Sequence, residues 1–324
     1  MDPKAYEVSA IEFTKEGCNG VSTEDLATAF KRKSGLLWVH VVANDITGSQ
    51  QFLLQTFRFH SLEVEDALSP HERPSLRVDD DSMFLVAPSV VSGGAKERYI
   101  EVAVFVGEHA LVTVVNEALP ALDHWMDRCQ TKPIAFGGSS SFLLHSILDT
   151  IVDGYFPAAD VLGEEIDDLE ESIYSARRVD VADALLLKRR LLEMRRQISP
   201  IRDILNGMLR RDVIFTAGEA RAHFQDVYDH TLRITEVIDM ERDILASVLD
   251  AHLSIVSNNL NQVMRTLTVI STVLMTGAFV AGVYGMNFKH MPELDWLFGY
   301  PFAVLLMAAL GALEVWFFRK QKWI

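Results

Sequence analysis

Two long apolar runs near the end of the chain dominate its hydrophobic pattern. Residues 266–284 carry no charge, and residues 297–318 carry only Glu314. Each run has the length that a helix needs to cross a hydrocarbon layer of roughly 30 Å. Because unpaired backbone groups are costly in lipid, both runs are expected to be helices. The pattern therefore predicts two membrane spans, joined by a short loop at residues 285–296.

The pattern before residue 130 alternates short strands with short helices. Strands are predicted where runs rich in Val, Ile, Phe and Tyr lie between turn-forming residues, at 6–14, 36–42, 83–91, 99–106 and 110–115. Helices are predicted at 22–33, 61–68 and 119–129, with Ser22 and Ser61 as candidate N-caps. The last two strands meet at Gly107-Glu108-His109, which suits a tight turn. This order predicts an α/β domain.

The pattern is helical from residue 141 to the first span, with breaks near 178–180 and 215–218. Residues 141–177 are acidic in their later half, whereas residues 188–211 are basic. Two adjacent helices of opposite charge are expected to pair antiparallel. The sequence leaves open whether this hairpin is only a salt-bridged pair or takes part in gating.

The third helix has neither proline nor glycine between Gly218 and Gly277. Running unbroken into the membrane, such a helix would reach on the order of 100 Å. Its apolar residues recur every three or four positions from Leu232 to Val263, so they lie on one face of the helix. A single helix would leave that face exposed to water, and we therefore expect an oligomer. The residues just before the span are polar and uncharged, which suits either a wet vestibule or the membrane interface: Ser257, Asn258, Asn259, Asn261 and Gln262.

Composition narrows the function. The 324 residues include 23% charged residues and a formal net charge of −15, which argues against nucleic acid as a ligand and favours cations. Cys18 and Cys129 are expected to be free thiols. The sequence contains no phosphate loop, nucleophile elbow or HExxH spacing, so an enzyme is not predicted. Its helical histidines are interpreted as isolated residues: His145, His223, His230 and His252.

Basic residues near the spans predict the orientation. Arg265 precedes the first span and Arg319, Lys320 and Lys322 follow the second, whereas the loop carries Lys289 against Glu293 and Asp295. By the positive-inside rule both termini are expected in the cytoplasm, with the loop outside. Residues 1–20 lack the apolar run of a signal peptide, in agreement with a cytoplasmic N-terminal body.

A specific motif lies directly after the first span. The segment Tyr284-Gly285-Met286-Asn287-Phe288, followed by Met291-Pro292-Glu293-Leu294 and a basic tail, resembles the CorA family of divalent-cation channels, whose signature is Gly-Met-Asn. The resemblance extends to Asn261-Gln262-Val263-Met264, to residues 224–230 and, more loosely, to Glu65-Asp66. It covers most of the chain.

The resemblance implies an α+β membrane protein of the cell (inner) membrane that assembles as a homopentameric funnel. Residues 1–215 would form a cytoplasmic α/β/α domain with the acidic and basic hairpin, and residues 216–265 a stalk helix that lines the pore. Residues 266–324 would form the transmembrane part, with the second span outside the first.

The resemblance also assigns roles residue by residue. Gly285, Met286 and Asn287 would form the selectivity filter, and the pore would be lined by Asn261, Leu267, Met275 and Gly282. Ala278 departs from relatives that carry threonine there, so a polar site at that position is doubtful. Carboxylates between subunits would bind regulatory Mg²⁺, at Glu65, Asp66, Asp226 and, less securely, Asp149. Glu293 and Asp295 would lie in the outer loop.

The sequence thus predicts a passive Mg²⁺ channel that also passes Co²⁺ or Ni²⁺ and is gated by cytoplasmic Mg²⁺. One alternative is a zinc transporter of the same fold. The other is a membrane-tethered metal sensor or scaffold without transport.

Overall fold

The computed structural model describes residues 5–14, 17–33, 35–69, 74–93, 96–131, 139–175, 181–210, 214–216, 218–287, 291–292 and 296–323. The chain divides into two compact units, Met1–Ala246 and Ser247–Ile324. Helix α8 (Ala220–Tyr284) contributes residues to both units.

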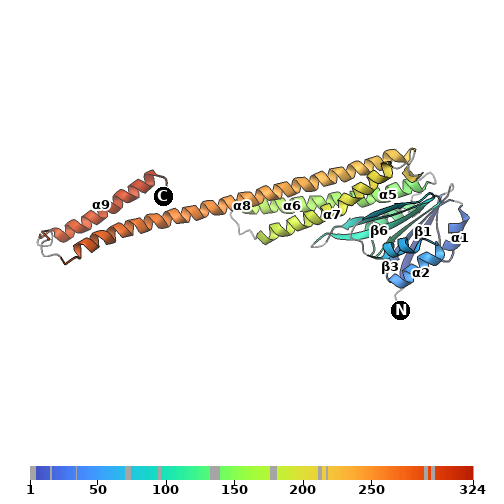
Figure 1. Cartoon of the computed structure of the whole chain (residues 1–324), viewed down its shortest axis with the longest axis horizontal. Coiled ribbons are helices and arrows are strands. Elements are labelled where there is room, and N and C mark those ends of the chain that lie inside the picture. The colour runs from blue at the N-terminus through green and yellow to red at the C-terminus, as the bar shows by residue number, and fades with distance from the viewer. Residues whose placement is uncertain are drawn as a thin grey trace. The chain divides into compact units, whose positions relative to one another are not determined.

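A seven-stranded sheet forms the centre of the first unit (Figure 1). Its spatial order is β2-β1-β3-β7-β6-β5-β4. The β3 and β7 strands pair in parallel, and every other neighbouring pair is antiparallel. The strands are β1 (Tyr6–Thr14), β2 (Gly17–Gly20), β3 (Leu36–Ala43), β4 (Ser75–Val78), β5 (Ser82–Val91), β6 (Arg98–Gly107) and β7 (Ala110–Val115).

Helices cover both faces of this sheet. On one face, α1 (Leu26–Arg32), α2 (Ile46–Thr56) and α3 (Ser61–Leu68) enclose a core with Leu37 and Val39 of β3. On the other face lie α4 (Pro120–Thr131), α5 (Ser140–Asp153), α6 (Tyr155–Tyr174) and α7 (Val181–Arg210). There the buried Tyr155 hydroxyl donates to the Pro88 carbonyl of β5 at 2.8 Å. The result is the α/β/α arrangement that the resemblance implied.

All five predicted strands are confirmed to within a residue at each end, but three short elements escaped prediction: β2, α2 and β4. Helix α1 begins at Leu26 rather than Ser22, because the Ser22 side chain bonds to Asp25 and closes a turn before the helix. The N-cap of α3 is His60 rather than Ser61, and its ring nitrogen accepts the Leu62 N–H at 3.3 Å.

The helix predicted over residues 141–177 is divided in two. Helix α5 ends at Asp153 and α6 begins at Tyr155, with Gly154 between them. The break near residues 215–218 is confirmed, since the short 3₁₀ helix η1 (Ile214–Thr216) separates α7 from α8. Gly218 has a φ of 66°, which a residue with a side chain adopts only with strain.

The acidic and basic helices α6 and α7 pair as predicted. Arg190 of α7 donates to Glu165 of α6 at 2.8 Å and to Glu97 at 2.7 and 3.0 Å. The side chains of Arg190 and Glu97 are only 10% and 7% exposed. Burial alone would raise the pKa of Glu97, but the hydrogen bonds and charge of Arg190 outweigh it and lower that pKa. This ion pair therefore fixes α7 against the sheet.

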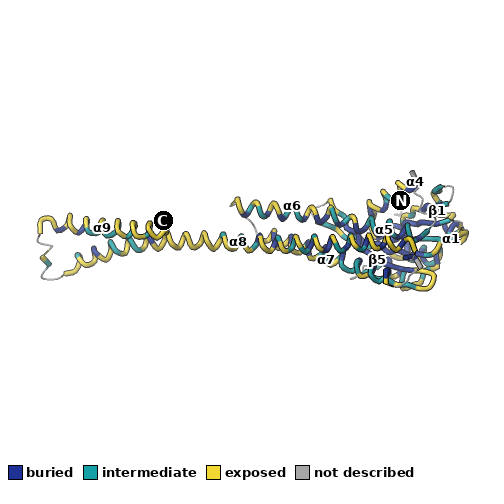
Figure 2. Tube along the Cα trace, turned by 90° about the horizontal axis from the view of Figure 1, so that it is seen from above, coloured by how far each residue is buried: buried dark blue, intermediate teal, exposed yellow. Residues whose placement is uncertain are grey.

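Two helices of the second unit have the length and hydropathy of membrane spans. One is α8, of 65 residues, and the other is α9 (Gly299–Lys320), of 22 residues. In Figures 1 and 2, α9 lies alongside the last turns of α8. A Cβ on Gly311 of α9 would lie 3.4 Å from Val273 of α8, so the two helices are in close contact. The two predicted spans are confirmed as helices, and α9 extends two residues past the predicted end.

Replacing Arg190 is expected to weaken the first unit. The Arg190→Ala variant leaves Glu97 buried without its cation, which should lower the free energy of unfolding by about 3–5 kcal/mol. Because the native pKa of Glu97 is lowered, this contribution is present above its ordinary pKa of 4.5 and is lost as the pH falls through the lowered value.

Urea unfolding followed by circular dichroism at several pH values measures this difference. Arg189→Ala, which removes an exposed arginine one residue away, is the control and should change stability by no more than about 0.5 kcal/mol. Equal effects of the two substitutions would show that the ion pair is not the cause.

Candidate functional site

Helix α8 ends directly before the Gly-Met-Asn tripeptide. The Gly285 N–H donates to the Ala281 carbonyl at 3.0 Å, and the Met286 N–H donates to the Val283 carbonyl at 3.3 Å. These bonds close the end of the helix by using carbonyls that would otherwise be unpaired. A Cβ on Gly285 would lie 3.3 Å from the Ala281 oxygen, so a larger residue would crowd this turn. Asn287 is exposed just beyond it.

One face of α8 packs on α9. Val269 and Val280 are 4% and 8% exposed, Val273 lies against Gly311, and Thr276 makes a hydrogen bond to α9. At about 100° per residue, these four α8 positions lie within an arc of about 60° of the helix. The narrow arc shows that α9 takes up only one side of α8.

The predicted pore residues lie on nearly the opposite side of α8. At about 100° per residue, Asn261, Leu267, Met275 and Gly282 fall within an arc of about 120°, whose centre is about 150° from that of the α9-facing arc. Leu267 and Met275 are 56% and 70% exposed. Within the part of the chain that is described, no atom lies within 4 Å of a Cβ built on Gly282. The four residues thus share one uncovered surface.

Two threonine hydroxyls in the span donate hydrogen bonds to carbonyls of their own helix. The Thr268 hydroxyl donates to the Met264 carbonyl and the Thr272 hydroxyl to the Thr268 carbonyl, each at 2.8 Å. Their protons are therefore used, and the oxygen lone pairs remain for other partners. Oxygen acceptors of this kind suit a hydrated cation.

The connector between the two spans is described only in part. Glu293 and Asp295, the two predicted outer-loop residues, lie outside the described residues. Where the chain is described again, the Trp296 ring packs against Phe298 and Phe302 with centroids 6.0 and 5.9 Å apart. Such aromatic clusters are typical of membrane–water interfaces.

Glu314 is the only charged residue in the second apolar run, residues 297–318, and its side chain faces α8. The Thr276 hydroxyl donates to Glu314 Oε1 at 2.6 Å. The other carboxyl oxygen, Oε2, is buried and has no hydrogen-bond partner among the described residues. A carboxyl group without hydrogen bonds is costly in an apolar environment. The Thr276 hydrogen bond therefore stabilises the position of α9 along α8.

A double-mutant cycle tests this contact. Thr276→Val removes the donor, leaves the carboxyl without a partner, and should destabilise the hairpin by about 1–3 kcal/mol. Adding Glu314→Leu should restore most of that loss, because both partners are then apolar. Thermal unfolding in nanodiscs measures the effect.

Thr272→Val is the control for this cycle, since that hydroxyl bonds within α8. A double variant that is less stable than Thr276→Val alone would contradict the account.

The predicted metal ligands fall into two groups in the first unit. On α3, Glu65 is exposed, and Asp66 makes an ion pair with Arg77 of β4. The second group lies between α5 and α8, where His230 Nδ1 is 3.2 Å from Asp153 and 3.7 Å from Asp149. One ligand atom from each of these three residues lies within 4.8 Å of the others, a spacing that fits one metal ion.

The charge of Asp226 acts on the second group of possible ligands. The pKa of Asp149 is raised, first by burial and then by the charge of Asp153, with Asp226 adding to the effect. Burial lowers the pKa of His145, as does the charge of His223. The charges of Asp153 and Asp226 thus oppose ionisation of Asp149, and a bound divalent cation would offset that repulsion.

The interpretation of the helical histidines as isolated residues was wrong for three of them. The His145 and His223 rings lie 5.0 Å apart, and His230 bridges two aspartates. Sequence reasoning missed Asp153 and His230 as possible ligands. The signal was present, since Asp153 follows Asp149 by four residues and His230 follows Asp226 by four, which puts each pair on one helix face.

Comparison with known proteins gives one clear family match. The family model described as "CorA-like Mg2+ transporter protein" matches residues 33–320. The chain is 31% identical over 325 residues to the "Cobalt/magnesium transport protein CorA" of Thermotoga maritima, with 98% of this chain and 93% of the relative covered.

Solved structures share the fold. The complete structure of the CorA magnesium transporter from Methanocaldococcus jannaschii matches with a TM-score of 0.85 at 22% identity, with 98% of each chain covered. The cytoplasmic domain of ZntB from Vibrio parahaemolyticus matches with a TM-score of 0.64 at 14% identity, covering 77% of this chain and 98% of that one. At these identities the likeness concerns the fold alone.

Proposed function

Since this chain belongs to the CorA-like Mg²⁺ transporter family, a family of ion transporters and not of enzymes, we propose that it conducts Mg²⁺ across the membrane, with Co²⁺ and Ni²⁺ as further cargo. The observation that carries this proposal is the uncovered surface of α8. This surface faces away from α9, and α8 ends three residues before the exposed Asn287. Several copies of that surface around an axis would enclose a path for ions.

The residue types along this surface suit a hydrated cation. Mg²⁺ gives up its water reluctantly, so a ring of Asn287 amide oxygens can hold the ion through its waters. A ring of carboxylates would bind more tightly and slow release. Leu267 and Met275 would form apolar constrictions of the pore that close by dewetting. At Asn261 the pore lining would be more polar, and at Gly282 the pore would be wider. Gly285 and Met286 would complete the filter with Asn287.

We infer a homopentamer, with α8 inside and α9 outside. The support within one chain is the set of large apolar side chains that α8 exposes, such as Leu253 at 64%, Leu260 at 62% and Val263 at 62%. Neighbouring copies would cover them. Residues 1–215 would then act as the soluble domain, residues 216–265 as the stalk and residues 266–324 as the membrane part.

The orientation follows from charge. Arg265, Arg319 and Lys320 lie at the same end of the hairpin, so both termini would face the cytoplasm and Asn287 the outside of the inner membrane. Ions would then enter at Asn287, and the membrane potential would drive them inward.

Regulation would come from Mg²⁺ bound to carboxylates of the first unit. Asp149 and Asp226, with Asp153 and His230 beside them, would face Glu65 and Asp66 of a neighbouring copy. Loss of the ion would leave like charges facing one another, which would loosen the ring. A hard cation suits this oxygen-rich set.

Two other functions are less well supported. A zinc transporter of this fold rests on a likeness to ZntB at 14% identity, which concerns the fold alone. A tethered sensor without transport would not require an uncovered, uncharged surface along the span. Competition of Zn²⁺ against Mg²⁺ flux distinguishes the first of these from the proposal.

Asn287→Ala tests the filter. Loss of the amide ring should lower Mg²⁺ influx into proteoliposomes by at least about tenfold, which corresponds to about 1.4 kcal/mol in the barrier. A fluorescent Mg²⁺ indicator inside the liposomes measures the influx. Asn19→Ala, in the exposed strand β2, is the matched control and should leave the influx unchanged. Unchanged influx through Asn287→Ala would rule out the assigned filter.

Asp226→Ala tests the regulatory site. On the side of the membrane that carries the first unit, high Mg²⁺ concentrations should close the unmodified channel. The variant should still conduct at these concentrations, because each regulatory site has lost one carboxylate. The dependence of flux on that concentration should shift upward by at least about tenfold. Asp168→Asn, an exposed carboxylate on α6, serves as the control. An identical concentration dependence in Asp226→Ala and the unmodified protein would contradict the assignment.

A further inference from the structure

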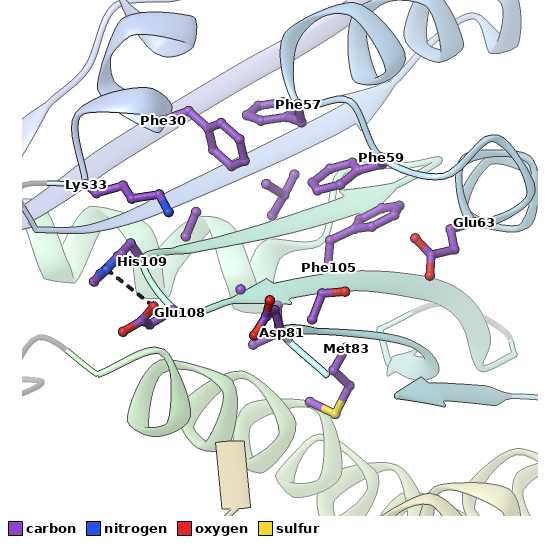
Figure 3. A pocket seen from close by; sticks show the side chains of 15 residues that line it. Phe30, Lys33, Phe57, Phe59, Glu63, Asp81, Met83, Phe105, Glu108 and His109 are labelled. Carbon is purple, nitrogen blue, oxygen red and sulfur yellow. Dashed lines mark ion pairs between the residues drawn. The ribbon is translucent and has the colours of Figure 1, made fainter. Parts of the chain in front are cut away.

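A cavity of about 430 Å³ opens at one end of the central strands of the sheet, beside the turn between β6 and β7 (Figure 3). Its size lies in the range of small-molecule sites. The strands form its inner wall through Phe105 and Val112, which are buried in the core beneath α1, α2 and α3. Its lining residues all belong to the unit Met1–Ala246, and none is a proposed pore or regulatory residue.

Phenylalanine rings give the cavity a preformed wall. The Phe59 and Phe105 rings stack with centroids 4.0 Å apart, and Phe57 stacks on Phe59 at 5.3 Å. Phe30 meets Phe57 edge-on at 5.2 Å. Because each ring is held by another, this wall does not need to reorganise when a ligand enters. In Figure 3, Phe30 and Phe59 project toward the opening in the middle of the view.

The rim of the cavity is mainly acidic. It carries Glu63, Asp81 and Glu108 against Lys33 and His109. His109 lies 3.6 Å from Glu108, so those two side chains partly offset each other. Burial raises the pKa of Glu63, and the charge of Asp79 raises it further, although Arg77 and His60 act the other way. The excess of carboxylates over cationic side chains at the rim favours a positively charged ligand.

The combination of an apolar wall and an acidic rim argues against three simple ligand classes. A hydrated metal ion would meet an apolar wall that offers no oxygen ligands, so half of the cavity would contribute nothing to its binding. An apolar molecule without charge would leave the acidic rim uncompensated. An anion would be repelled by the excess of carboxylates.

We propose that this cavity binds an organic amine, with an apolar body among the phenylalanine rings and an ammonium group at the acidic rim. Glu63 of α3 is the main anchor of the ammonium group, because it is the half-buried carboxylate of the rim. The apolar body would lie over Phe59, Phe105 and Ala110.

The test uses the full chain in lipid nanodiscs and three probes that share one body. These are the para-fluoro derivatives of phenethylamine, hydrocinnamate and propylbenzene, followed by fluorine NMR, with empty nanodiscs as the blank for partition into lipid. The amine should bind at least about tenfold more tightly than the acid, with the uncharged probe between them. Equal or tighter binding of the acid would overturn the proposal, as would amine binding no greater than in empty nanodiscs.

Two variants locate the binding. Glu63→Gln should weaken binding of the amine by about tenfold and leave the uncharged probe unaffected. Ala110→Phe fills the cavity from β7 and should weaken binding of both probes by a similar factor. The exposed Glu24→Gln is the matched control, since it removes one carboxylate outside the cavity.

Circular dichroism checks the folding of each variant, and the two substitutions lie on different elements, so one remains informative if the other does not fold. Unchanged binding of the amine in a folded Glu63→Gln or Ala110→Phe protein would contradict the assigned site.

Discussion

The constraint on which the second unit depends is the apolar surface that α8 presents. In a single chain, α9 covers only one side of it, and residues such as Leu260, Leu267 and Leu274 remain 56–68% exposed. At about 25 cal/mol per Å² of apolar surface, leaving this many large side chains in water would cost many kcal/mol. Lipid can cover part of this surface, and copies of the same chain can cover the rest. The membrane location and the proposed ring both follow from it.

The cluster of possible metal ligands in the first unit and the span of α8 differ in the strength with which their side chains bind a cation. In the first unit, Asp149, Asp153 and His230 converge within 4.8 Å, where charge and direct ligation favour a retained ion. Along the span, most side chains are aliphatic, and the oxygen- and sulfur-bearing ones are amides, hydroxyls and thioethers, which interact with a cation only weakly. A regulatory site has to hold its ion, whereas a conduction path has to release it. The chemistry of the two regions therefore fits the regulatory and conducting roles that we propose for them.

The two spans could be predicted from their long apolar runs, and the five longer strands and the α/β class from the period of the pattern. The α/β/α arrangement was implied by the family resemblance. Sequence reasoning missed β2 and β4, which have only four residues each and are too short for a period. It missed the N-cap of α3 because His60 caps through a ring nitrogen, which the usual Ser, Thr, Asp and Asn rule does not cover.

Of the candidate sites, those formed by a local motif could be predicted from the sequence, whereas those formed by packing between helices could not. The tripeptide at 285–287 is local, so its position after α8 could be predicted. The approach of His230 to Asp149 and Asp153 depends on the packing of α5 against α8, which no local pattern contains. The side of α8 that faces α9 likewise became apparent only from Val273, Thr276 and their contacts.

The central claim is that the chain forms a passive path for Mg²⁺. Purified protein in liposomes, with an imposed potassium diffusion potential and no proton gradient, tests it most directly. The account predicts Mg²⁺ influx that increases as the interior is made more negative and that needs no other ion gradient. Absence of Mg²⁺ influx at every imposed potential, or influx only when a proton gradient is present, would contradict it.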